Sequence, residues 1–203
     1  MTLTKLHKLN AKVLLIFLGV HFANHMVLLV GRESHLIVMQ MLRSIYRMQL
    51  VEYPLLALFA VQIILGLALI AKRGRPKGAW AWAQVLSGGY IAFFLLQHVG
   101  AIILARFNFD LETTTYFAAA VVSGTPYGYY FFVYYVLGVT AVFTHLAAAL
   151  RFAAWPAPAK GWHTALPFVG FAFGLALITS LSWGSAKDLP EENRAYIEKS
   201  FKR

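Results

Sequence analysis

Five long apolar runs alternate with shorter polar stretches along the chain. At 1.5 Å per residue, each run is about long enough to cross the roughly 30 Å hydrocarbon core of a bilayer as a helix. The expected spans cover residues 13–30, 51–71, 84–105, 129–152 and 166–183. The pattern predicts an all-α integral membrane protein, a five-transmembrane-helix bundle that forms a single domain over residues 1–203.

Two connections between the spans are longer than the others. In residues 32–50, apolar side chains are interspersed with arginines, which is typical of an amphipathic helix lying in the membrane interface. In residues 107–128, we expect a short helix over Tyr116 to Val122. Both connections fall on one side of the membrane, so short interfacial helices are predicted there. The tail, residues 187–203, carries mixed charge and predicts a short surface helix.

Composition limits the function classes that remain. Only 13% of residues are charged, against about 25% in a soluble domain, so there is no room for a sizeable soluble domain. The chain has no cysteine, which excludes disulfides, thiolate catalysis and iron–sulfur clusters.

The net charge of +10 is distributed unevenly between the two sides of the predicted bundle. The side with the N-terminus, called side A here, carries these basic residues and no acid: Lys5, Lys8, Lys12, Lys72, Arg73, Arg75, Lys77, Arg151 and Lys160. The other side, side B, carries the remaining basic residues and all of the acids. The positive-inside rule therefore places the N-terminus in the cytoplasm and the C-terminus outside, in a bacterial-type inner (plasma) membrane. The basic excess meets anionic lipid, and no nucleic-acid role is expected.

Four histidines lie within the predicted spans, where ionisable side chains are costly and indicate function. His98 precedes Arg106 by eight residues, about 12 Å, and His25 precedes Arg32 by seven, about 10 Å. Both depths are measured from side B, so two imidazoles are expected at one level. His21 lies one turn deeper than His25 on the same helix face.

Two imidazoles at one level can bind one metal between two helices. With no cysteine and few buried carboxylates, the matching cofactor is a haem b with two imidazole ligands in the bundle core, with His25 and His98 as metal ligands. His21 is an alternative ligand, or it faces a propionate or a quinone. The alternative for each histidine is a hydrogen bond to a neighbouring helix. We expect that role for His145, which lies near side A.

Roles can also be predicted for polar residues other than the expected haem ligands. A quinone pocket under the side B connections would be lined by His35, Arg43, Arg47 and Tyr116. Gln62 is expected to join helices by hydrogen bonds, because its amide needs partners in lipid. We expect His163 at the interface and His7 in solvent.

Several short motifs resemble one known family. The stretch Trp82-Ala83-Gln84-Val85-Leu86-Ser87-Gly88, followed by Phe93-Phe94 and His98, is similar to the W-x-Q-x-x-[ST]-G helix of the cytochrome b membrane subunit of succinate dehydrogenase and fumarate reductase, in its five-helix dihaem type. Gly19 with His25-Met26 resembles the first helix of that family. The run from Thr144-His145 to Leu150-Arg151 resembles its fifth helix.

The resemblance implies a haem ligated by His25 and His98, electron transfer to or from a quinone, and an N-terminus in the cytoplasm. The family supplies a second ligand to its cytoplasm-side haem from a histidine in the second helix. This chain has Gln62 as the nearest candidate there. The expectation is therefore one haem, on side B, with cofactor contacts from His21, His25, His98 and His145.

Two other functions fit the same residues. A haem-free anchor or assembly subunit of a larger complex would use the histidines only for interhelical hydrogen bonds and would bind other subunits. A non-haem metal enzyme would use His21, His25, His35 and His98 as a cluster, although such sites usually recruit Glu or Asp.

Overall fold

The computed structural model describes residues 2–123, 126–182 and 189–201. In these ranges the chain is helical and contains no strand. The elements are α1 (Leu3–Met26), η1 (Val27–Leu29), α2 (Arg32–Tyr46), α3 (Gln49–Arg73), α4 (Ala79–Phe109), α5 (Thr115–Ser123), α6 (Gly128–Ala153), α7 (Gly161–Ser182) and α8 (Glu191–Phe201). The predicted all-α class is confirmed.

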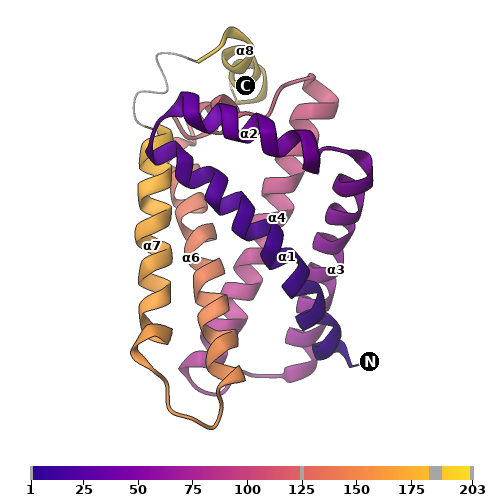
Figure 1. The fold of residues 1–203 in the computed structure, drawn as a ribbon, viewed down its shortest axis with the longest axis vertical. Coiled ribbons are helices and arrows are strands. Elements are labelled where there is room, and N and C mark those ends of the chain that lie inside the picture. Colours follow the sequence, from indigo (N-terminus) through magenta and orange to yellow (C-terminus); the bar gives the residue numbers. More distant parts are fainter. Residues whose placement is uncertain (1, 124–125, 183–188, 202–203) are drawn as a thin grey trace.

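Five helices are long and apolar enough to cross a membrane: α1 with η1, α3, α4, α6 and α7. They form an elongated bundle that α1 crosses obliquely, from α3 at one end to α6 and α7 at the other (Figure 1). Large apolar side chains such as Ile16 and Phe168 remain more than 70% exposed on the bundle. That exposure is expected of a surface that faces lipid.

The helices are longer than the apolar runs predicted. The first begins at Leu3 rather than residue 13, because Thr2 caps it by accepting a hydrogen bond from the Lys5 backbone N–H at 3.3 Å. Lysines are good helix formers, so the basic residues before the apolar run continue the helix. The predicted ends at residue 183 and at residues 187–188 and 202–203 lie outside the described residues.

The two ends of the bundle differ as the charge pattern predicts. The N-terminus and the α3–α4 and α6–α7 connections lie at one end, and α2, α5 and α8 lie at the other (Figure 1). We call these the side A end and the side B end. The predicted interfacial helices are present as α2 and α5, and the tail helix is present as α8. A break at Trp155-Pro156-Ala157-Pro158 follows α6, as expected of two prolines.

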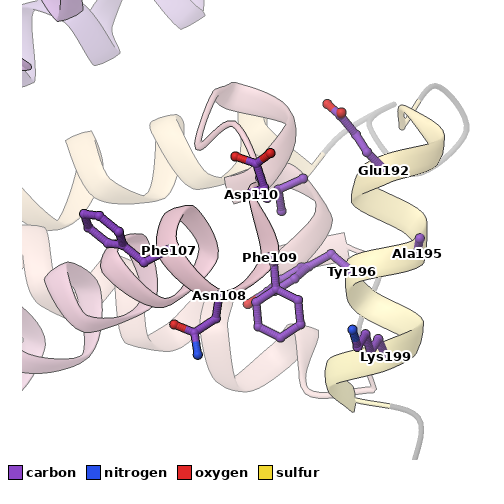
Figure 2. A pocket seen from close by; sticks show the side chains of 9 residues that line it. Phe107, Asn108, Phe109, Asp110, Glu192, Ala195, Tyr196 and Lys199 are labelled. Carbon is purple, nitrogen blue, oxygen red and sulfur yellow. The ribbon is translucent and has the colours of Figure 1, made fainter.

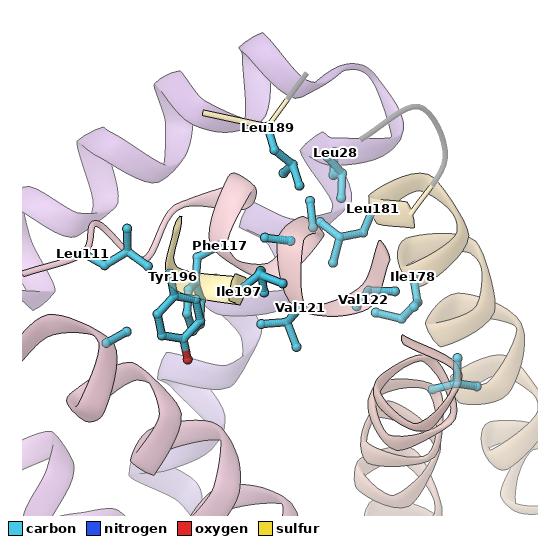
Figure 3. Close-up of a cluster of buried hydrophobic side chains, with 14 residues drawn as sticks. Leu28, Leu111, Phe117, Val121, Val122, Ile178, Leu181, Leu189, Tyr196 and Ile197 are labelled. Atoms are coloured by element: carbon cyan, nitrogen blue, oxygen red, sulfur yellow. The ribbon is translucent and has the colours of Figure 1, made fainter. Parts of the chain in front are cut away.

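A group of buried apolar side chains lies at the side B end (Figure 3). It joins α5 and α8 to the ends of α4, α6 and α7, with Phe117, Val121, Ile178, Leu181 and Ile197 among its members. Helix α8 also leaves a pocket beside the end of α4 (Figure 2). At the side B end, α5 and α8 therefore form a small apolar core with the ends of the membrane-spanning helices.

Glycines allow the spans to pack closely where the candidate site is held. A Cβ at Gly174 of α7 would lie 3.2 Å from the Val136 carbonyl oxygen of α6. A Cβ at Gly138 of α6 would lie 2.5 Å from the Phe94 ring of α4. Small residues at such contacts let helix backbones approach in lipid. Because Gly138 has no Cβ, there is room for the Phe94 ring, on which His98 stacks.

Candidate functional site

Three imidazoles meet in the part of the bundle nearer side B. His21 and His25 come from α1, with ring centroids 4.5 Å apart, and His98 comes from α4, with its centroid 6.3 Å from that of His21. We call these three residues the outer imidazole cluster. The sequence predicted that imidazoles from these two helices meet at one level, and the structure brings them together. It places His21, rather than His25, beside His98.

The cluster is free of competing hydrogen bonds. Among the described residues, no side chain or backbone group makes a hydrogen bond with His21, His25 or His98. The three rings are partly buried, and a histidine that served only to join helices would form a hydrogen bond with a neighbouring helix. The three rings are instead left with their nitrogens available for a ligand.

Aromatic side chains form the walls around these imidazoles. Phe17 stacks on His21 with centroids 5.6 Å apart, and Phe94 stacks on His98 at 5.2 Å. Tyr135 of α6 presents its ring to His98 edge-on at 6.0 Å. The aromatic surroundings suit neutral imidazoles, and no carboxylate among the described residues pairs with these rings.

His35 of α2 covers the cluster from the side B end. Its ring lies 5.3 Å from that of His25, and it is 1% exposed. Asn24 Nδ2 lies 3.3 Å from His35 Nε2, and His35 Nδ1 lies 2.7 Å from Thr115 Oγ1. An amide NH₂ can only donate, so Nε2 accepts and the Nδ1–H donates to Thr115. Burial lowers the pKa of His35, which keeps the ring neutral.

The other predicted quinone residues gather at the same place, where α2 meets the α4–α5 connection. Arg43 pairs with Glu112, and Arg47 reaches the same carboxylate at 3.3 Å and Thr113 Oγ1 at 3.1 Å. Tyr116 lies under the Arg32 guanidinium at 5.5 Å. These polar groups are engaged with one another and tie α2 to α5, so the structure gives them a structural role; a quinone role stays a prediction.

Electrostatics at this joint follow from the excess of arginine. Burial raises the pKa of Glu112, but Arg43 and Arg47 outweigh it and hold that pKa below its ordinary value. Burial and the neighbouring Arg43 and Arg106 lower the pKa of Arg47. The carboxylate is therefore the shared counter-ion of two guanidiniums.

A second polar group of side chains lies near the side A end, and here the histidines are bonded. His145 Nδ1 lies 3.1 Å from the Gln84 carbonyl oxygen and 3.2 Å from Ser87 Oγ, both on α4. A carbonyl only accepts, so Nδ1 carries the proton. This is the interhelical hydrogen bond expected for His145, and it joins α6 to α4.

Gln62 joins helices as expected. Asn10 Nδ2 donates to Gln62 Oε1 at 2.7 Å and to the Leu58 carbonyl at 2.9 Å, which links α1 to α3. The expectation that His7 is solvated is wrong. Gln62 Nε2 lies 3.3 Å from His7 Nε2, and His7 Nδ1 is buried without a hydrogen-bond partner among the described residues. The early start and oblique path of α1 bring His7 against α3.

His163, which was expected at the interface, lies in the first turn of α7 at the side A end and is buried there. The ring is 1% exposed, because it folds back onto the start of α7, where its Nδ1 accepts from the Lys160 backbone N–H at 2.9 Å. It also stacks on Trp162 at 3.7 Å. His163 is therefore a buried capping residue of α7 and not part of the candidate site.

The donor set of the outer imidazole cluster fits a metal held between two imidazoles. Two ring nitrogens that bind one metal from opposite sides lie roughly 4 Å apart, twice a bond of about 2.0 Å, and a centroid separation of 6.3 Å accommodates that. Within the described ranges, no group of three or more His, Asp or Glu side chains could hold a metal ion. The non-haem cluster alternative therefore gains no support.

Comparison with known proteins adds no further constraint. No protein-family model, curated protein or solved structure matches the chain. The resemblance to the cytochrome b membrane subunits therefore stays a prediction, and the function is argued from the site alone.

Sequence reasoning missed several residues that the site depends on. Asn24 and Thr115 hold His35, and Glu112 joins the two arginines. Asn24 could have been found by a search for amides within apolar runs, because Asn in lipid needs a partner. The other contacts depend on how the connections fold over the bundle.

Proposed function

We propose that the protein is a membrane electron carrier that holds one haem b between α1 and α4 in the half of the bundle nearer side B. The observation that supports this most directly is that the ring centroids of His21 and His98 lie 6.3 Å apart, with no hydrogen bond from either ring to any of the described residues. In the proposed orientation, side A faces the cytoplasm and the haem lies nearer the outer face.

When bound, a haem supplies one-electron chemistry, and its potential follows from its axial ligands and from burial. The chain supplies His98 from one helix and either His21 or His25 from the other. Phe17, Phe94 and Tyr135 pack against the rings of His21 and His98. The surrounding side chains are apolar and both ligands would be neutral, so the protein would not offset the extra positive charge of a ferric haem. This environment would favour the reduced, ferrous haem.

The exchange partner in this proposal is a quinone that reaches the site from the side B end. His35, Arg43, Arg47 and Tyr116 lie at that end, and His35 is in ring contact with His25. Because Arg43 and Arg47 are paired with Glu112, a quinone would have to share or displace those contacts. Their cationic excess over one carboxylate suits the oxygen of a reduced quinone.

A haem-free anchor or assembly subunit is the second candidate, and one feature favours it. Helix α2 exposes Ile37, Met41 and Ile45, each by more than half, along one face at the side B end. That face fits either the lipid interface or another subunit. A protein of this class would copurify with a partner chain and would be colourless.

An optical experiment separates the two candidates. The protein is produced in a host that makes haem b, purified in detergent, and examined by reduced-minus-oxidised spectroscopy and haem extraction. We expect a low-spin bis-imidazole spectrum with one haem per chain, lost in His98→Ala and kept in Gln97→Ala, an exposed neighbour on α4. A folded wild-type protein that contains no haem under these conditions would exclude the electron-carrier proposal.

A further inference from the structure

A pocket of about 490 Å³ lies between the end of α4 and α8, away from the imidazoles (Figure 2). Its volume is within the usual range for small-molecule sites. One wall is the end of α4 and the residues after it, Phe107 to Leu111, and the other is the face of α8 with Glu192, Ala195, Tyr196 and Lys199. Leu111 and Tyr196 are buried and form an apolar floor.

Charges of both signs line the pocket without forming ion pairs. Asp110 and Glu192 extend on the same side of the opening, and Lys199 lies farther along α8 beside Phe109 (Figure 2). Lys199 Nζ lies 5.4 Å from the centroid of the Phe109 ring. Among the described residues, none of these three charged groups has a salt-bridge partner. The pocket thus offers two anionic acceptors at one end and one cationic donor at the other.

The pocket opens where the membrane-spanning part of α4 ends. Phe107 is 73% exposed and Leu104 is 47% exposed, on the lipid-facing side of the same helix. The acyl chain of a membrane lipid could lie along this apolar surface while the polar headgroup of the lipid entered the pocket. A water-soluble ligand would make no use of that surface.

We propose that this pocket binds the headgroup of a phosphatidylethanolamine-type lipid. The ammonium group would lie between Asp110 and Glu192, since a primary ammonium has three N–H donors for carboxylate oxygens. The phosphate would lie beside Lys199, and the acyl chains would follow Phe107 and Leu104 down α4. A choline headgroup has no N–H to donate, and a glycerol headgroup has no cation for the two carboxylates.

The test uses delipidated full-length protein in detergent, titrated with dilauroyl lipids of ethanolamine, choline and glycerol headgroups and followed by native mass spectrometry. We expect the ethanolamine lipid to bind at least tenfold more tightly than the other two. The double variant Asp110→Asn with Glu192→Gln removes that preference. Lys199→Met weakens the ethanolamine and glycerol lipids alike, and Glu191→Gln, on α8 but outside the pocket, leaves binding unchanged.

Two control experiments distinguish a lipid from a soluble ligand and a binding defect from unfolding. Soluble glycerophosphoethanolamine carries the same ammonium and phosphate without acyl chains, and it should compete only weakly; strong competition would assign the pocket to a soluble metabolite instead. Circular dichroism melting of each variant checks that the fold is kept. Equal binding of all three lipids, or an unchanged preference in the folded double variant, would overturn the proposal.

Discussion

Histidines near the two ends of the bundle differ in their hydrogen bonding. Near side A, His145 and His7 are joined to α4 and α3 by hydrogen bonds. Near side B, His21 and His98 approach each other from two helices, and neither ring is hydrogen-bonded within the part of the chain that the structure describes. In lipid, a histidine that serves as a structural link must use its polar atoms on a neighbour. The proposal that the outer imidazole cluster binds a ligand rests on the absence of such links among the described residues.

Replacing single histidines tests this difference between the two ends, and we expect it to have the largest effect. His21→Ala should abolish the haem spectrum, because His21 is the α1 imidazole nearest His98. His25→Ala should keep the haem with an altered spectrum, since its ring contacts His21 and His35 instead. His145→Ala should keep it unchanged. Reduced-minus-oxidised spectra of the three purified variants give the answer.

The reverse outcome would assign the roles differently. If His145→Ala loses the haem while His21→Ala and His25→Ala keep it, the side A end holds the cofactor and the comparison fails. If only His25→Ala loses it, the site is correct and the α1 ligand is the one expected from the sequence.

Removing a link at the side A end should have an intermediate effect. Asn10→Leu breaks the hydrogen bonds to Gln62 and Leu58, and we expect a loss of about 1–2 kcal/mol in the free energy of unfolding. Haem content should not change. Denaturant unfolding in detergent measures the loss, with Gln40→Leu, an exposed substitution on α2, as the control. A loss of haem without a loss of stability would contradict the structural role of this end.

The ion pairs over the side B end should have the smallest effect. Glu112→Gln removes the counter-ion of Arg43 and Arg47, but its side chain is 63% exposed, so we expect less than about 1 kcal/mol at low salt. Because the arginines lower the pKa of Glu112, the unfolded chain binds its proton at higher pH than the folded chain does.

The stabilisation from Glu112 is therefore present above its ordinary pKa, near 4.5, and is lost as the pH falls through and below that value. Unfolding curves of the wild type and Glu112→Gln, measured from neutral pH to well below 4.5, should converge in acid. They should also converge at high salt, which screens the pair. A difference that grows on acidification would show that the pairing in solution is not the one in the structure.

Much of the fold could be predicted because lipid imposes it. An apolar run has few options in a bilayer, so the five spans and the grouping of their connections follow from hydrophobicity and charge. Helix ends were less predictable, since Lys5 and Lys8 are as compatible with helix as with solvent. The matched level of His98 and the α1 histidines followed from counting residues to the nearest charge.

What the count could not provide was the direction of α1. Depth along a helix is a depth in the membrane only for an upright helix, whereas α1 crosses the bundle obliquely (Figure 1). That slant places His21 rather than His25 beside His98 and brings His7 against Gln62. Packing angles depend on side chains from every neighbouring span, so local sequence does not specify them.

The apolar core on top of the spans also has a consequence for how the protein is made. Helix α8 is the last described segment to leave the ribosome, and its Tyr196 and Ile197 belong to that core. The core therefore closes only after α1 and α4 have both entered the bilayer. Until then α5, whose Thr115 is hydrogen-bonded to His35, lacks its contacts with α8.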